Sequence, residues 1–264
     1  MKRRQFVKSA LVSGAVAGLG ATETIAAMKN NPDQQEFYEL RIYTLKNNAQ
    51  QQLVESYYEQ AAIPALNRLG IKNIGVFAEW LPQEFTKLFV VIPFSSPGEY
   101  LTIEDSLTKD AAYLTASIPY LSAPATAPAY ERIQSSLLKA FKQMPQMAIP
   151  EKKDRIFELR RYESPSETTG KKKIEMFNDA GEISIFKRTG LIPVFFGEAI
   201  IGEARPNLTY MLTFDNMEAH DRNWKTFISD PEWKKLSGMP EYANDRILSN
   251  IRRTFLVPCK CSQV

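Results

Sequence analysis

Two similar stretches of sequence each bring a carboxylate, a guanidinium group and a phenol together at alternate positions. Residues 36–45 read EFYELRIYTL, and residues 155–164 read RIFELRRYES. Alternate side chains of an extended strand point to the same face of a sheet. An arginine on such a face can bind an anion, and a phenol can orient it by a hydrogen bond. The candidate ligand-binding residues are therefore Glu39, Arg41 and Tyr43 in the first copy and Glu158, Arg160 and Tyr162 in the second.

Two interpretations of these residues are open from the sequence. In the functional one, the apolar face that begins at Tyr38 packs on helices, and the charged face points into a polar pocket between two sheets. Arg41 and Arg160 then bind a small ligand. In the structural one, each glutamate and its arginine form an ion pair that ties neighbouring strands and fixes their register. The sequence assigns no catalytic residue.

His220 is the only histidine, so a histidine base or haem ligand would have to be this residue. It shares a helical stripe with Met217, Trp224 and Phe227, at spacings of three and four. An axial haem ligand on a helix is chemically reasonable, and a packing role is the alternative. We predict no cofactor, with haem at His220 as the other hypothesis. Only the second copy could bind it, because Tyr100 stands at the equivalent position of the first.

Other recognisable chemistry is missing from the sequence. It has no glycine-rich phosphate loop and no nucleophile elbow. Cys259 and Cys261 are separated by one residue, and two ligands are half of a usual zinc set. We therefore predict no metal site. The two thiols are expected in a solvated tail, either free or paired with another chain.

The resemblance between the two stretches extends along the chain as an internal repeat. Arg68-Leu69-Gly70 is matched 120 residues later by Arg188-Thr189-Gly190, and Asp110 is matched by Asp230. At the last strand we align Ser135 with Ser249, an offset of 114. The repeat predicts two homologous domains, which span residues 36–145 and 155–258.

Each domain shows the same order of predicted elements. The first has strands at 37–44, 71–80, 87–94 and 130–141, one helix at 49–69, and a second helix that begins after Ser96. This βαββαβ order is that of a ferredoxin-like unit, whose four-stranded antiparallel sheet has helices on one face. The other face of the sheet must also be shielded from water by packing. The predicted fold class is α+β, with two tandem ferredoxin-like domains whose sheets cover each other in an intrachain barrel.

Residues 1–27 have the composition of an export signal. Arg3-Arg4-Gln5-Phe6-Val7-Lys8 resembles the twin-arginine signal and precedes a short apolar run. We expect export by that pathway to the periplasm or the exterior, with no membrane span after cleavage. The chain has 33 basic and 30 acidic residues; this segment holds four of the basic and one of the acidic ones, which leaves 29 of each. A balanced charge predicts no nucleic-acid partner.

The repeated strand and the Asp-Pro-Glu-Trp stretch resemble the NIPSNAP family of dimeric α/β-barrel proteins. The stretches that carry the resemblance are Tyr38 to Leu45, Arg68-Leu69-Gly70, Asn207 to Tyr210 and Asp230-Pro231-Glu232-Trp233. The first domain departs from the pattern, with Asp110-Ala111-Ala112-Tyr113 in place of Asp-Pro-Glu-Trp. The resemblance implies a fused pair of barrel-forming domains. It implies no catalytic residues.

These observations predict a protein that binds a small apolar or aromatic molecule between the two sheets. The alternative is a monooxygenase-like oxidoreductase that uses the same cavity, without a cofactor or with haem. A homo-oligomer could form through open strand edges.

Overall fold

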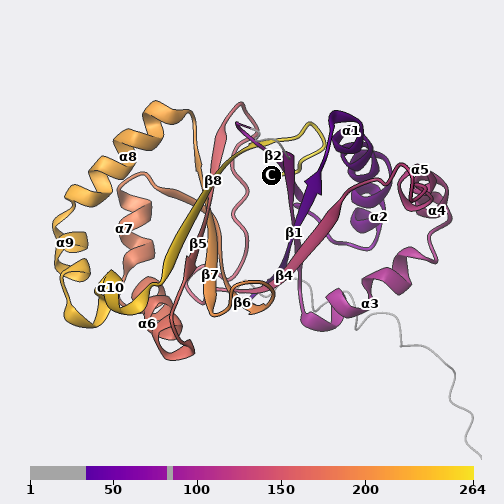
Figure 1. Ribbon diagram of the computed structural model, residues 1–264. Coiled ribbons are helices and arrows are strands. Elements are labelled where there is room, and N and C mark those ends of the chain that lie inside the picture. Colours follow the sequence, from indigo (N-terminus) through magenta and orange to yellow (C-terminus); the bar gives the residue numbers. More distant parts are fainter. Residues whose placement is uncertain (1–33, 82–85) are drawn as a thin grey trace, which may run out of the picture. The chain divides into compact units, whose positions relative to one another are not determined.

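Eight antiparallel strands close into a barrel in the part of the chain that the structure, a computed structural model, describes: residues 34–81 and 86–264. The order around the barrel is β1-β3-β2-β8-β5-β7-β6-β4 (Figure 1). The strands are β1 Phe37–Leu45, β2 Gly75–Glu79, β3 Thr86–Phe94, β4 Arg132–Ala140, β5 Ile156–Glu163, β6 Ile192–Ile201, β7 Asn207–Phe214 and β8 Asn250–Pro258.

The two halves of the chain contribute four neighbouring strands each, in equivalent orders. The first half runs β4-β1-β3-β2, and the second runs β8-β5-β7-β6. The halves join where β2 pairs with β8 and β4 pairs with β6. Closure leaves these strands no free edge, so the predicted assembly through open strand edges has no edge to use.

The register of the last strands corrects one detail of the repeat alignment. Leu137 lies opposite Glu39, whereas Phe255 lies opposite Glu158. The equivalent positions of β4 and β8 are therefore 118 residues apart and not 114. The error arises because exposed strands without a sharp hydrophobic pattern align poorly by sequence alone.

The helices of each half cover the outer face of that half's strands (Figure 1). Those of the first half are α1 Asn48–Tyr57, a π-helical turn Tyr58–Ala62, α2 Ile63–Arg68, α3 Pro97–Leu107, α4 Ala111–Ala116 and α5 Ile118–Leu121. Those of the second are α6 Glu167–Asn178, α7 Glu182–Arg188, α8 Met217–Ser229, α9 Pro231–Ser237, a 3-10 turn Pro240–Tyr242 and α10 Asn244–Ile247.

Local sequence signals explain where these helices begin and bend. The side chain of Ser96 accepts a hydrogen bond from the Glu99 amide, as the sequence predicts for the start of α3. Asn216 does the same for α8. Pro64 has no amide hydrogen to continue the α-helical pattern. The chain forms a π-helical turn before it, in which the Ile63 amide bonds to the carbonyl of Tyr58.

Three apolar cores result from this arrangement. One fills the barrel and combines both halves, including Tyr38, Leu40 and Phe89 with Phe157 and Phe195. The other two lie outside the barrel, between each half's strands and its own helices. Eight-stranded barrels have an interior that side chains can fill. The inner faces of the strands are thus apolar, and much of the outer face that meets the helices is apolar too.

This placement reverses the predicted orientation of the repeated strand. The alternation is correct, but Tyr38, Leu40 and Ile42 point into the barrel. Glu39 and Arg41 point to the helices. The prediction is wrong because alternation separates two faces without identifying the inner one, and the helices supply partners for the polar face.

The last residues of the chain are held against the first half. The Cys259 amide bonds to the Val76 carbonyl, and the Gln263 amide bonds to the Ile74 carbonyl. Both thiols are free and half-buried against the first-half core. Burial, with Glu55 nearby, raises the pKa of Cys261 to about 11. The expected solvated tail is thus packed, and its thiols are poor nucleophiles.

Within residues 34–81 and 86–264, no helix is long and apolar enough to cross a bilayer.

Candidate functional site: a tyrosine-lined cavity in the first half

A cavity of about 390 Å³ lies between the first-half strands and helices. Glu39 and Arg41 of β1 line it, together with residues of α1 to α5 and the turn between α5 and β4. Leu114 and Leu121, which are 45% and 57% exposed, belong to its outer part. Five tyrosines line the cavity: Tyr57, Tyr58, Tyr113, Tyr120 and Tyr130. The cavity is thus mostly apolar, with hydroxyl groups and one cation.

The cation is Arg41, which is held in place by Glu39. Arg41 donates from Nε and Nη2 to the two oxygens of Glu39, at 3.0 and 2.8 Å. Ser135 of the neighbouring strand also donates to Glu39. Burial lowers the pKa of Arg41, but the oxygens of Tyr58, Glu39 and Tyr43 more than offset this and raise it. The Arg41 side chain remains 23% exposed, so a ligand in the cavity can reach it.

The tyrosine hydroxyls form two hydrogen-bonded groups around Arg41. The Tyr43 hydroxyl lies 2.9 Å from that of Tyr58 and 3.2 Å from that of Tyr120. The Tyr57 hydroxyl lies 3.0 Å from that of Tyr113. Burial is the main reason why the pKa values of Tyr57, Tyr58 and Tyr120 are raised. These phenols stay protonated at neutral pH and can donate hydrogen bonds.

The π-helical turn helps to build this wall. It follows Tyr57 directly, and Tyr58 is its first residue. Both side chains line the cavity together with Ala62, and the rings of Tyr57 and Tyr120 stack with centroids 3.9 Å apart. A single-turn π-helix inside an α-helix is frequent at functional sites.

The equivalent residues of the second half occupy filled space. Arg160 donates from Nη1 to Glu158 at 2.8 Å, as in the first half. Trp224 of α8 donates its indole N–H to the other oxygen of Glu158 at 3.0 Å. Its ring lies over the Arg160 guanidinium, 4.5 Å from the ring centroid. Glu158 is fully buried. The Tyr162 hydroxyl accepts from Tyr210.

The halves differ at one position of the helices that face these arginines. Helix α3 begins after Ser96, and helix α8 begins after Asn216, which is 120 residues later. Position 224 of α8 therefore corresponds to position 104 of α3, which is Glu104. Glu104 is exposed and lines the cavity. A glutamate that turns to solvent leaves open the space over Arg41 that an indole fills over Arg160.

His220 lies apart from the cavity, in the core of the second half. Its Nδ1 is 2.8 Å from Asp221 Oδ1, and its Nε2 is 3.4 Å from Glu158 Oε2. The ring packs between Phe214, Trp224 and Phe255. An axial ligand needs a nitrogen that faces open space for the haem. Both nitrogens face carboxylates here, so these residues do not fit haem.

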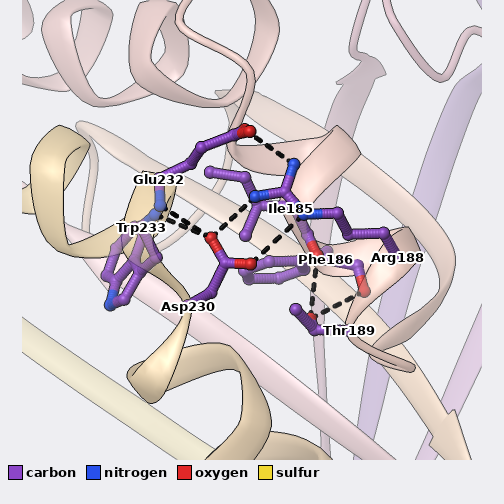
Figure 2. A network of polar contacts seen from close by, with 7 residues as sticks. All are labelled: Ile185, Phe186, Arg188, Thr189, Asp230, Glu232 and Trp233. Atoms are coloured by element: carbon purple, nitrogen blue, oxygen red, sulfur yellow. Dashed lines mark hydrogen bonds and ion pairs between the residues drawn. The ribbon is translucent and has the colours of Figure 1, made fainter.

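The repeated Arg and Asp residues form a separate, structural contact in each half. Arg188 binds Asp230, and Asp230 also accepts from the amides of Glu232 and Trp233 at the start of α9 (Figure 2). Arg68 binds Asp110 in the same way in the first half. The Asp-Pro-Glu-Trp stretch thus caps a helix and attaches it to α7.

The structure divides the predicted site residues into two clusters. It brings Glu39, Arg41 and Tyr43 together in the first half, and it gathers Glu158, Arg160, Tyr162 and His220 in the second. The sequence reasoning missed the tyrosines of the helices and Glu104. A comparison of positions 104 and 224 at the repeat offset could have pointed to the open half. Among residues 34–81 and 86–264, no group of three or more potential metal ligands occurs.

Comparisons with known proteins agree with this architecture. Residues 157–263 match the NIPSNAP family model. A "putative monooxygenase" from Fusobacterium nucleatum has a similar fold, with a TM-score of 0.55 and 10% identity, over 86% of this chain and 93% of that one. A second "putative monooxygenase", from Lactobacillus acidophilus, has a TM-score of 0.55 and 12% identity over 85% and 94%.

A third solved structure extends the same likeness. An anthrone oxidase-like protein has a TM-score of 0.50 and 8% identity, over 88% of this chain and 93% of that one. No curated protein matches the sequence. At these identities the likeness shows the fold: a mixed α/β protein with a closed eight-stranded antiparallel barrel, as in the monooxygenase-like proteins.

Proposed function

We propose that the protein binds a small aromatic molecule that carries an oxygen substituent in the tyrosine-lined cavity of its first half. The observation that carries the proposal is the replacement of Trp224 by Glu104 at the equivalent position, which leaves Arg41 accessible. Apolar cavities with a few convergent polar groups are the usual form of small-molecule sites. The predicted site between the sheets thus moves to the space between the sheet and the helices.

The lining residues define which ligand chemistry fits. The tyrosine rings and neighbouring aliphatic side chains favour a flat apolar body. The protonated hydroxyls and Arg41 favour an oxygen that accepts hydrogen bonds or carries negative charge. Phenols, naphthols and their carboxylate analogues combine both features.

Monooxygenase-like oxidation without a cofactor is the second candidate function. The support from proteins of similar fold is limited to their names, two "putative monooxygenase" proteins and an anthrone oxidase-like protein. In the described part of the cavity, the buried carboxylate of Glu39 is engaged by Arg41 and Ser135. Tyr57, Tyr58 and Tyr120 have raised pKa values and are protonated. The site can therefore stabilise an oxyanion, but it suits a substrate that is already ionised better than one that the protein must deprotonate.

Calorimetric titration with 2-naphthol, 2-naphthoate and naphthalene tests the proposal. We expect the two oxygen-bearing probes to bind more tightly than naphthalene. The variant Glu104→Trp should weaken their binding at least about tenfold, because the indole can fill the cavity as Trp224 does. Asp105→Trp is the matched control, since Asp105 is an exposed neighbour that does not line the cavity.

Two results would overturn the binding proposal: none of the probes binds, or Glu104→Trp and Asp105→Trp behave alike. Oxygen uptake with an ionised naphthol then separates binding from oxidation. Uptake that is abolished by Glu104→Trp would favour the enzyme, and binding without uptake would favour the binding protein.

We further propose that the whole chain is a tandem NIPSNAP-like protein that the twin-arginine pathway exports. The strand orders β4-β1-β3-β2 and β8-β5-β7-β6, which suit two ferredoxin-like domains, support the duplication. The family match over 157–263 supports the second domain. Export rests on the signal in residues 1–27, which lie outside the described residues. Arg3→Lys with Arg4→Lys should leave the precursor inside the cell.

A further inference from the structure

Another cavity lies at one mouth of the barrel, between the two halves. Its volume is about 210 Å³. Strands of both halves line it, because Leu40, Phe89 and Leu159 belong to the shared core of the barrel. The remaining lining residues are Ile42, Lys87, Gln134, Arg161, Glu203, Thr209, Arg252 and Thr254. Barrel mouths are frequent ligand sites, and this one is separate from the tyrosine-lined cavity.

The charged side chains at this mouth are mainly cationic. Lys87, Arg161 and Arg252 line the cavity, against one carboxylate, Glu203. Glu203 is 3.6 Å from Arg161 and half exposed. Strands of both halves bring these cations together, and Glu163 and Glu203 offset only part of their mutual repulsion. An anion in the cavity would relieve it.

A half-buried carboxylate, Glu163, positions the two arginines. Glu163 Oε1 accepts from Arg161 Nε at 2.9 Å and lies 3.2 Å from Arg252 Nε. Its other oxygen accepts from Asn250 at 3.1 Å. Both contacts use the Nε atoms, and Arg161 Nη1 faces Glu203. Arg161 Nη2 and the two terminal nitrogens of Arg252 are left for another acceptor. Planar guanidinium groups suit carboxylate and phosphate oxygens.

We propose that this barrel mouth binds a small organic anion, with a carboxylate or phosphate group on Arg161, Arg252 and Lys87. Its apolar part rests on Leu40, Ile42 and Phe89, which form the inner end of the cavity. Thr209, Thr254 and Gln134 offer further hydrogen bonds. The volume lies below the usual range of drug-sized pockets, about 300–1,000 Å³, so the anion is a small one.

Adjacent residues of β8 supply a matched pair of variants. Arg252 lines the cavity, whereas Arg253 lies on the opposite face of the strand, beside Arg160 in the sheet register. Arg252→Gln and Arg253→Gln remove the same charge. In the Glu104→Trp background, which fills the tyrosine-lined cavity, titrations with inorganic phosphate, benzoate and uncharged benzyl alcohol should show binding of at least one anion and none of the alcohol. Arg252→Gln should weaken anion binding at least about tenfold, and Arg253→Gln less than about twofold.

The Glu104→Trp background separates this site from the tyrosine-lined cavity, since anion binding at the barrel mouth should survive that change. The preferred head group follows from whether phosphate or benzoate binds more tightly. Absence of binding by both anions overturns the proposal. Equal weakening in the Arg252 and Arg253 variants overturns it too, because that result indicates unspecific attraction to a basic surface.

Discussion

Arg188 holds Asp230 through two of its guanidinium nitrogens, Nη2 to Oδ1 at 2.6 Å and Nε to Oδ2 at 3.2 Å. The same relationship joins Arg68 to Asp110, 120 residues earlier at both positions. In each half the aspartate also begins a helix, by accepting a hydrogen bond from the amide of Tyr113 or Trp233. This contact attaches a short helix to the end of another in both halves.

The helix cap and the ion pair at Asp230 can be separated by substitution. Asp230→Asn keeps a good capping side chain but loses the charge that pairs with Arg188. Asp230→Ala loses both. The ion pair is exposed and contributes little by itself. We therefore expect the alanine variant to lower the urea midpoint clearly and the asparagine variant to lower it much less. Equal losses in the two variants would contradict the importance of the cap.

Trp224 should stabilise the second half through its hydrogen bond as well as its packing. Trp224→Phe keeps an aromatic ring over Arg160 but leaves one oxygen of buried Glu158 without its indole donor. We expect a loss of about 1–3 kcal/mol in the free energy of unfolding, the usual cost of an unsatisfied buried polar group. Chemical denaturation measures it.

The control for that experiment is Trp233→Phe. Trp233 packs on Phe227 with ring centroids 4.3 Å apart, away from Glu158. Its replacement changes the packing without touching that carboxylate. If the two variants lose the same free energy, the hydrogen bond to Glu158 contributes nothing of its own.

His220 should make stability depend on pH above its ordinary pKa of 6.5. Burial lowers the pKa of His220, but hydrogen bonds to Glu158 and Asp221 more than offset this and raise it. A raised pKa stabilises the folded state fully below 6.5, and this stabilisation is lost as the pH rises through the higher folded value. We expect the advantage of the wild type over His220→Gln to shrink above pH 6.5. Urea unfolding at several pH values measures it, and a constant difference would refute the prediction.

The shared interior of the barrel should make the two halves unfold together. Phe157 of the second half is fully buried, and its ring centroid lies 4.9 Å from that of Phe77 of the first. We expect Phe157→Ala to cost about 3–5 kcal/mol, as for other large buried aromatics. Unfolding should remain one transition by fluorescence and by circular dichroism. Two separate transitions would show that the halves fold independently.

Much of the fold follows from local patterns in the sequence. The alternation of residues 37–44 predicts strand β1, and Ser96-Pro97-Gly98-Glu99 predicts the start of α3. Arg68 and Arg188, which the sequence alignment matches, both pair with an aspartate.

The candidate site could be predicted only in part. Glu39 and Arg41 were identified, but the tyrosines that surround them come from helices that sequence spacing does not place over β1.

The sequence by itself determined the order of the elements and their caps, because these depend on short-range hydrogen bonds and on periodicity. Only the tertiary structure decided which face of each strand is the inner one, since alternation defines two faces and barrel closure selects between them. It also decided that the first half is open and the second filled. That choice depends on whether residue 104 or 224 can cover an arginine on a strand more than sixty residues away in the chain, and packing across that distance is not written in any local pattern.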